Sequence, residues 1–415
     1  MRLAVVGLQW GDEGKGKIVD YLAKDFDINA RYQGGSNAGH TVRHNGEKVI
    51  FHQIPCGVLN KNVTGIIGAG CVLDPRIFFN ELESLKKYDS KIEERVKVSK
   101  FCHLIMPYHV LIDEIREATK QAIGTTKKGI GVAYEDKYGR IGLRVGDLYN
   151  IEKFENRLRL NISRKNLVLM DVYNAEPLSD NEILELYMNH AKKLKPMVID
   201  ETRFLSDAIA AGKHILFEGA QGALLDIDFG TYPYVTASHT ITGSVPIGLG
   251  IPPGSVQRVL GVAKAYTTRV GQGPFPTEDS GQLGTMLRES GAEFGSTTGR
   301  PRRCGAFDAP LVRYSARING VSDMVLTKLD ILSDFDTIRI AKGYKGEKEF
   351  DPFRSEQLEP EYIEVRGFKR DISRARARND LPEAARDYIK SIEDHTGLRV
   401  SYVSVGPERD AIIRM

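Results

Sequence analysis

The opening of the chain, an apolar run followed by a glycine-rich loop and a helix pattern, constrains the fold more than any other feature. Residues 3–7 have the continuous apolar character of a buried strand, and residues 15–24 have helical periodicity. The loop between them is LQWGDEG. A strand, a glycine-rich turn and a helix in this order are typical of nucleotide-binding α/β proteins. The sequence therefore predicts that this loop binds a phosphate at the helix N-terminus.

This loop differs from the standard phosphate-binding loop in two ways. Six residues separate its outer glycines, two more than in the G-x-x-x-x-G-K-[ST] pattern, and Gly16 replaces the hydroxyl residue that usually binds magnesium. Lys15 can supply charge to a phosphate, and Asp12 is the nearest hard oxygen ligand for Mg²⁺. The alternative is that Asp12 and Glu13 only cap the helix and interact with its dipole. The segment alone leaves both interpretations open.

Later segments alternate between helix and strand patterns. Helix patterns begin after Ser179 and after Asp380, each a capping residue, and the second pattern ends at Gly397. An apolar strand pattern follows at residues 399–407. This alternation predicts one α/β domain over residues 1–415, with a large, mostly parallel central sheet and helices on both faces.

Residues 219–280 hold many glycines and few helix signals. Segments such as ITGSVPIGLGIPPG and TTRVGQGPFPTE have the composition of loops at strand ends. Long loops in a compact protein are usually functional, and the alternative is a set of structural turns that need glycine for positive φ. The sequence therefore predicts long functional loops.

Two further stretches carry candidate binding groups. YQGGSNAGHT offers exposed backbone with Asn37 and His40, and a histidine there can donate a proton, although a lone histidine in a turn is often structural. TKLD, at the end of an apolar strand, is similar to the element by which GTPases bind guanine. A carboxylate such as Asp330 accepts from two donors that adenine lacks, while the Lys328 stem lies along the base. The alternative is a buried ion pair.

Arginines gather in two places. The loop STTGRPRRCGAFD carries Arg300, Arg302 and Arg303, and arginine side chains match carboxylates and phosphates bidentately. This loop therefore suits a small anionic substrate. The second cluster, residues 366–378, contains six cations with acidic neighbours and is interpreted as a solvated face, with RNA binding as the weaker alternative.

The composition excludes several classes of protein. A net charge of +3 is too small to indicate nucleic acid or a membrane surface as a partner. No apolar run approaches the roughly 18 residues of a membrane span. The four cysteines lack the paired spacing of a metal site. We therefore expect a soluble cytoplasmic protein with reduced thiols.

Nine motifs occur in one order from end to end: QWGDEGKGK, RYQGGSNAGHT, GIGVAYEDKYGR, FEGAQGALLDID, GTYPYVT, TTRVGQGPFPTE, TTGRPRRCG, TKLD and SVGP. Together they resemble the adenylosuccinate synthetase family. The resemblance implies a P-loop GTPase-like nucleotide site and a GTP-dependent ligase that joins IMP and L-aspartate to adenylosuccinate and releases GDP and phosphate. It also implies Mg²⁺ and a 6-phosphoryl-IMP intermediate, in the first committed step from IMP towards AMP.

The resemblance implies roles for residues at matching positions. Asp12 would be the general base and, with the backbone carbonyl of Gly39, would ligate Mg²⁺. His40 would hydrogen-bond the transferring group and act as an acid. Lys15 and Gln221 complete the expected catalytic set, and helix capping stays the interpretation of Glu13.

The implied binding residues form three sets. Those for GTP are Gly11, Asp12, Glu13, Gly14, Lys15, Gly16, Lys17, Gly39, His40, Thr41, Arg302, Lys328, Leu329, Asp330, Ser404, Val405 and Gly406. Those for IMP are Asp12, Asn37, Ala38, Gly39, His40, Thr126, Arg140, Gln221, Thr236 and Arg300. Those for aspartate are Ser296, Thr297, Thr298, Gly299, Arg300, Pro301 and Arg302.

The resemblance further implies a homodimer, in which Arg140 reaches the IMP phosphate of the neighbouring subunit, and neither nucleic acid nor membrane as partner. Two residues depart from the family pattern: Val132 stands for a proline and Ala306 for a tryptophan. We expect these changes to affect affinity or loop order rather than activity. The alternative from another class, a regulatory GTPase, shares the phosphate loop and TKLD but does not need the arginine loop.

Overall fold

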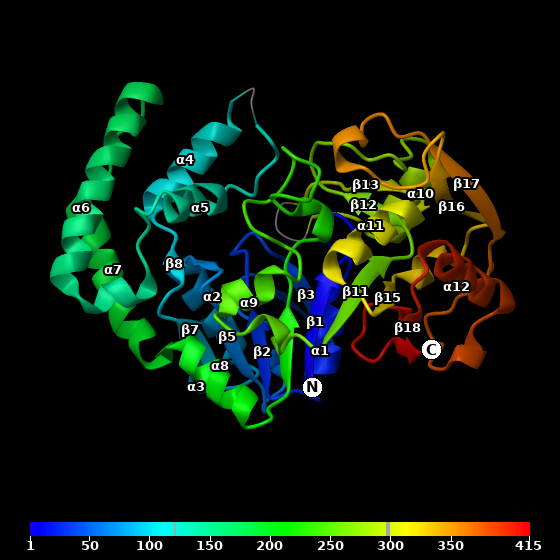
Figure 1. Cartoon of the computed structure of the whole chain (residues 1–415), viewed down its shortest axis with the longest axis horizontal. Coiled ribbons are helices and arrows are strands. Elements are labelled where there is room, and N and C mark those ends of the chain that lie inside the picture. The colour runs from blue at the N-terminus through cyan, green and yellow to red at the C-terminus, as the bar shows by residue number, and fades with distance from the viewer. Residues whose placement is uncertain (120–121, 296–298) are drawn as a thin grey trace.

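The computed structural model describes residues 1–119, 122–295 and 299–415. A ten-stranded sheet forms its centre, in the order β19-β18-β15-β11-β1-β10-β2-β5-β7-β9 (Figure 1). Neighbouring strands are parallel except β18 and β19 at one edge. In chain order these strands are β1 (Arg2–Gly7), β2 (Ile28–Arg31), β5 (Thr64–Ile67), β7 (Val96–Ser99), β9 (Val198–Ile199), β10 (Ile215–Glu218), β11 (Arg258–Lys264), β15 (Asp323–Thr327), β18 (Val400–Ser404) and β19 (Ile412–Arg414). The predicted large, mostly parallel sheet is confirmed.

Helices cover both faces of this sheet, as predicted, because alternate residues of its strands enter two separate cores. In β1, Ala4 and Val6 lie in one core and Leu3 and Val5 in the other. The first core includes α8 (Glu201–Ala210), α9 (Ser244–Leu249), α10 (Gln282–Ser290), α11 (Ala309–Asn319) and α12 (Glu383–Thr396). The second includes α1 (Lys15–Ala23), α2 (Pro75–Leu85), α3 (Ile92–Arg95), α4 (Pro107–Glu117), α6 (Ile151–Leu167) and α7 (Asp180–Leu194).

Smaller sheets flank the central one. Three are two-stranded: β3 (His40–His44) with β4 (Glu47–Phe51), β6 (Val72–Leu73) with β8 (His103–Leu104), and β12 (Thr267–Arg269) with β13 (Arg303–Gly305). A three-stranded sheet contains β14 (Phe307–Asp308), β16 (Thr337–Tyr344) and β17 (Pro360–Arg366). Figure 1 shows β16 and β17 on the opposite side of the molecule from α6 and α7.

Helix capping was predicted correctly at two of three positions. The Ser179 side chain accepts a hydrogen bond from the Glu182 backbone N–H at the start of α7, and Gly397 ends α12 with a φ of 71°. Asp380 does not cap α12, which begins after Pro382. The Asp380 carboxylate instead accepts from the backbone N–H groups of residues 376 and 377. Pro382 disfavours helical backbone in the residue before it, and this separates Asp380 from the helix.

Of two other sequence predictions, one is partly wrong and one is confirmed. The segment ITGSVPIGLGIPPG is not a loop throughout, because residues 244–249 form the short helix α9. The basic segment 366–378 is a solvated face, as predicted: its six cations are exposed, whereas Phe368, Ile372 and Ala375 anchor it in the core.

The residues that depart from the family pattern are both buried. Val132 belongs to α5 (Ile130–Tyr138) and packs in a cluster with Ile112 and Leu169. Ala306 follows β13 and donates its backbone N–H to the carbonyl of Thr277. Val132 is 2% exposed and Ala306 is 6% exposed, so neither side chain faces solvent.

The parallel strands bring distant segments to one edge of the sheet. The loops after β1, β2, β10, β15 and β18 all leave from carboxyl ends, where α/β proteins bind ligands. Within the described ranges, none of the helices combines the length and apolar character that a membrane crossing requires.

Candidate active site

A cavity of about 1450 Å³ lies at the carboxyl edge of the parallel strands. This volume exceeds the usual range for a single small ligand, so the cavity can accept more than one. The predicted site residues that line it are Gly11, Asp12, Gly14, Lys15, Gly16, Lys17, Asn37, Ala38, Gly39, His40, Thr41, Thr126, Gln221, Thr236, Arg300, Arg302, Lys328, Asp330, Ser404 and Gly406. Three-dimensional folding thus brings together residues that are up to several hundred positions apart.

Several predicted site residues lie elsewhere. Leu329 and Val405 are fully buried in the core beside the cavity. Arg140 is exposed at the end of α5 and is not among the residues that line this cavity. Gly299 and Pro301 flank a cavity residue without lining the cavity themselves. The predicted aspartate-binding residues Ser296, Thr297 and Thr298 lie outside the described residues.

Glu13 does not cap the helix, contrary to the sequence interpretation. The N-cap is Gly14, with a φ of 86° and no side-chain cap. The Glu13 carboxylate is completely buried beneath the loop, where it accepts from the backbone N–H of Gln9 at 3.1 Å and of Gly11 at 2.9 Å. Its other oxygen lies 2.5 Å from Lys15 Nζ. The two additional loop residues therefore allow a carboxylate to fold back under the loop and hold it.

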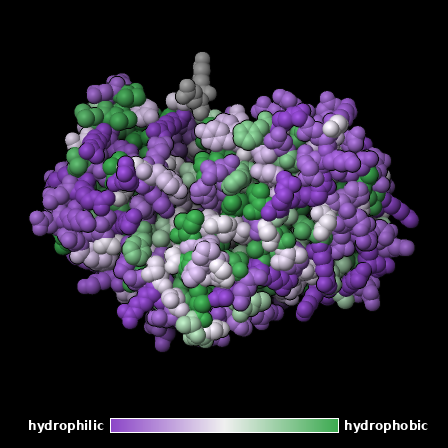
Figure 2. All heavy atoms as spheres, in the orientation of Figure 1, coloured by the Kyte–Doolittle hydropathy of each residue, from purple (hydrophilic) through white to green (hydrophobic). Residues whose placement is uncertain are grey.

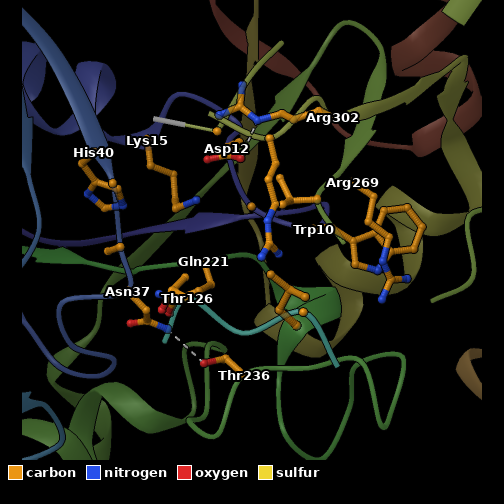
Figure 3. Close-up of a pocket in the computed structure, with 18 of the residues that line it drawn as sticks. Trp10, Asp12, Lys15, Asn37, His40, Thr126, Gln221, Thr236, Arg269 and Arg302 are labelled. Atoms are coloured by element: carbon orange, nitrogen blue, oxygen red, sulfur yellow. Dashed lines mark hydrogen bonds and ion pairs between the residues drawn. The ribbon is translucent and has the colours of Figure 1, made fainter. Parts of the chain in front are cut away.

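Asp12 faces the cavity and does not cap the helix either. Its Oδ2 lies 2.7 Å from Nε of Arg302, and its side chain is 31% exposed (Figure 3). The backbone of Asp12 is left-handed, with a φ of 59°, and Gln221 and Lys328 share this conformation at 57° and 58°. Non-glycine residues rarely adopt it, and they concentrate at functional sites. All three residues with this uncommon backbone conformation line the cavity.

His40 is oriented by an acid that the sequence analysis did not single out. His40 Nδ1 lies 2.7 Å from Glu218 Oε1, and Glu218 also accepts from the backbone N–H of Cys56 at 2.9 Å. Nε2 of the His40 ring has no hydrogen-bond partner among the described residues. Burial lowers the pKa of His40, although Glu218 opposes this shift. The sequence signal for Glu218 was its position at the end of the strand in FEGAQG.

The expected purine-nucleotide side chains surround another part of the cavity. The side-chain amide of Asn37 donates to the hydroxyl of Thr236 at 3.3 Å (Figure 3). Gln221 is more informative, because both polar atoms of its buried amide lack partners within the described residues. A buried amide of this kind is costly unless a ligand satisfies it. Gln221 is therefore suited to bind a polar ligand.

Lys328 of the TKLD segment forms an ion pair with a buried carboxylate, as the alternative interpretation predicted, and its partner is Glu293. Lys328 Nζ donates to Glu293 Oε1 at 2.7 Å and to the carbonyl of Gly291 at 3.1 Å. Asp330 lines the cavity, and burial raises the pKa of its carboxyl. The nearby Lys17 donates to the Ser404 hydroxyl at 2.8 Å and to the carbonyl of residue 406 at 2.7 Å. Lys17 therefore connects helix α1 to the loop after β18.

Glu293 and Arg269 are further polar residues that the sequence analysis missed. Glu293 is fully buried and contacts both Lys328 and Arg302. The Arg269 guanidinium lies 4.9 Å from the Trp10 ring centre and donates to the carbonyl of Tyr234 at 3.0 Å. Burial lowers the pKa of Arg269 to about 9. The only sequence signal for Arg269 was its place in the motif TTRVGQGPFPTE.

Two arrangements are relevant to metal binding. His40, Cys56 and Glu218 have potential ligand atoms within 4.8 Å of one another, but these atoms already hydrogen-bond each other and are buried. The carboxylate of Asp12 opens onto the cavity, which Gly39 also lines. Carboxylate and carbonyl oxygens are the donors that Mg²⁺ prefers, so Asp12 and Gly39 suit this ion better.

Comparisons with known proteins agree with this geometry. The family model described as adenylosuccinate synthetase matches residues 4–413. An adenylosuccinate synthetase from Carboxydothermus hydrogenoformans is 48% identical over 419 residues, which cover 99% of this chain and 98% of that protein. The corresponding protein from Salinibacter ruber is 47% identical over 425 residues, with coverages of 99% and 97%. The structure of fully ligated adenylosuccinate synthetase from Plasmodium falciparum has a TM-score of 0.94 at 41% identity, with coverages of 100% and 99%. The chain therefore belongs to the adenylosuccinate synthetase family and is a ligase.

Proposed function

We propose that this ligase converts IMP, L-aspartate and GTP into adenylosuccinate, GDP and phosphate, with Mg²⁺ and through a 6-phosphoryl-IMP intermediate. The observation that supports this reaction most strongly is that Lys15, Asp12 and Arg302 line one cavity. A cation at a helix N-terminus suits a phosphate, a carboxylate suits a general base, and an arginine suits a dicarboxylate. One cavity thus contains a cation for the phosphates of GTP, a base for IMP and an arginine for aspartate.

In the proposed first step, Asp12 takes the proton from N1 of IMP, which makes the 6-oxygen nucleophilic. The 6-oxygen bonds to the γ-phosphorus of GTP while the bond from that phosphorus to the β,γ-bridging oxygen breaks, and GDP leaves. Lys15 offsets negative charge on the transferred group. His40 hydrogen-bonds the same group through Nε2, the ring nitrogen that faces away from Glu218.

In the proposed second step, the amino group of aspartate bonds to C6 as the C6–O bond breaks and phosphate leaves with the amine proton. Arg300 and Arg302 would bind the carboxylates of aspartate, since both line the cavity. Asp12 and the Gly39 carbonyl would hold Mg²⁺, whose charge offsets repulsion between the base and the phosphates.

Asp330 is the proposed guanine reader. Its carboxylate would accept from the N1–H and 2-amino groups of guanine, while the Lys328 stem lies along the ring. Ser404 and Gly406 would enclose the base, and Lys17 already fixes both through hydrogen bonds. Asn37, Thr126, Gln221 and Thr236 would bind IMP, a proposal that the unsatisfied amide of Gln221 supports.

The proposed assembly is a homodimer in which Arg140 reaches the IMP phosphate of the neighbouring subunit. Arg140 is exposed and outside its own cavity. The adjacent residue 141 accepts from Asn161 of α6 at 2.7 Å. On α6 and the π-helical segment that continues it (Val168–Val172), Leu160, Leu167 and Val172 are more than half exposed. Figure 2 shows apolar side chains at the upper left of the molecule, where Figure 1 shows one end of α6. Exposed apolar side chains of this kind suit contact with a second copy of the chain.

The dimer is tested by mixing two inactive variants, Arg140→Leu and Asp12→Asn. If Arg140 acts across the interface, one site of each mixed dimer has both residues intact and activity partly returns. Mixed dimers that form, as shown by native mass spectrometry, yet stay inactive would place Arg140 in its own subunit.

The reaction is tested by combining the protein with GTP, IMP, aspartate and Mg²⁺ and following the absorbance of adenylosuccinate. Omitting any one component should stop both adenylosuccinate formation and phosphate release. GTP hydrolysis that needs neither IMP nor aspartate would instead indicate a regulatory GTPase.

A further inference from the structure

The buried carboxylate of Glu293 connects two parts of the cavity. Glu293 lies just after α10 and is completely buried. Its Oε1 contacts Lys328 Nζ at 2.7 Å, Lys264 Nζ at 3.1 Å and the Tyr266 hydroxyl at 2.5 Å. Its Oε2 contacts an Nη atom of Arg302 at 2.5 Å. The two oxygens of one carboxylate thus serve different parts of the site.

The partners of Glu293 differ in their access to the cavity. The Lys264 side chain is completely buried, whereas Lys328 is 30% exposed and Arg302 is 9% exposed. Both Lys328 and Arg302 line the cavity. Lys264 and Tyr266 therefore anchor Glu293 from behind, and the other two cations present their remaining donors to ligands.

The charges of this cluster do not balance internally. One carboxylate faces three cations, and the cations hold the pKa of Glu293 below its usual range although burial opposes them. Asp12, at 2.7 Å from Arg302, offsets one further charge. A buried group of this kind is stable only while its partners remain paired. Movement of one cation towards a ligand therefore changes how strongly Glu293 holds the others.

We propose that Glu293 is a positioning residue that couples the nucleotide-base end of the cavity, through Lys328, to the dicarboxylate end, through Arg302. This inference rests on the proposed function, which assigns guanine to Lys328 and aspartate to Arg302. When guanine nucleotide draws Lys328 towards itself, the anchored Glu293 holds Arg302 more strongly and keeps it in position for a dicarboxylate. Thermodynamic linkage then requires the dicarboxylate to favour the nucleotide by the same factor.

The coupling is measured without turnover, by titrating GDP into the protein calorimetrically with and without L-aspartate and in the absence of IMP. In the wild type, aspartate should tighten GDP binding by a factor between about 5 and 150, the usual range for coupled sites. Glu293→Gln keeps the shape of the side chain but removes its charge, and the factor should fall to about one. The apparent KM for aspartate should rise more than kcat falls, because no reacting group is removed.

A matched control comes from Arg303, the residue after Arg302 and the first of β13. Arg303 pairs with Glu278 at the partly exposed side of β13, and Glu278 does not line the cavity. Glu278→Gln removes the carboxylate that pairs with Arg303, the residue next to Arg302. Because neither Glu278 nor Arg303 lines the cavity, this change should leave the coupling factor unchanged. If Glu293→Gln does not fold, Lys328→Met provides the second test, because it removes one arm and keeps Glu293 paired with three other groups. It too should abolish the coupling.

The outcomes separate this inference from the proposed function. A wild-type protein that binds neither GDP nor aspartate contradicts both. Binding of both ligands with no mutual effect, or a coupling that survives in Glu293→Gln and Lys328→Met, overturns the role of Glu293 and leaves the proposed function standing.

Discussion

The replacement Glu13→Gln tests whether a buried carboxylate maintains the conformation of the loop after β1. Glutamine keeps an oxygen that can accept from the N–H groups of Gln9 and Gly11, but it cannot neutralise Lys15. Two effects follow from the observed contacts at 2.5–3.1 Å. Hydrogen bonds to a charged group contribute about 1.5–3 kcal/mol, against about 1 kcal/mol for neutral ones. Lys15, only 3% exposed, also loses its ion-pair partner.

The expected loss of stability is about 3 kcal/mol. Breaking a fully buried pair costs about 3–5 kcal/mol, and the adjacent cavity moderates this because Lys15 can turn towards water. The unfolding entropy of 415 residues is about 0.9 kcal/mol/K, from an average of about 2.1 cal/mol/K per residue. The melting temperature of the ligand-free protein should therefore fall by about 3–4 °C.

Differential scanning calorimetry at fixed scan rate measures this change. GDP should narrow the difference between variant and wild type, because a bound phosphate replaces the lost partner of Lys15. Glu47→Gln is the control, since Glu47 forms an exposed pair with Lys87 and should shift the melting temperature by less than about 1 °C. A Glu13→Gln protein with the melting temperature and the kcat of the wild type would refute this account of the loop.

Three other outcomes are expected. Asp12→Asn should abolish adenylosuccinate formation while GDP binding measured by calorimetry stays within about threefold, and normal turnover would exclude Asp12 as the base. Asp330→Asn should lower the preference for GTP over ATP by about tenfold or more in initial-rate assays, whereas an unchanged preference would locate guanine recognition elsewhere. Burial raises the pKa of Asp308 to about 7, so the folded protein holds this proton more tightly than the unfolded chain and loses stability as pH rises from about 4 to 7. The free energy of unfolding, measured with urea, should therefore fall less between about pH 4 and 7 in Asp308→Asn than in the wild type. The same dependence of this free energy on pH in both proteins would contradict the prediction.

The sequence alone determined the features that depend on local pattern. The apolar run and glycine-rich turn correctly gave β1 and the start of α1, and the alternation of patterns correctly gave a mostly parallel sheet with helices on both faces. Gly397 and Ser179 were identified because a helix end is governed by its nearest residues. The position of Asp12 in the cavity was likewise expected, because a loop after a central strand lies at the ligand-binding edge.

Only the tertiary structure decided which charged groups meet. Glu13 is next to the helix in sequence, which favoured capping, but its carboxylate folds beneath the loop and reaches Lys15. Glu293 has no distinguishing local pattern, and Glu218 has only its position at the end of a strand; both become important because folding brings them to Lys328 and His40. The His40–Glu218 and Lys328–Glu293 pairs join residues 178 and 35 positions apart, and periodicity and propensity carry no information over such separations. The sequence therefore determined the elements and the edge where the site lies, and packing determined the partners of each charge.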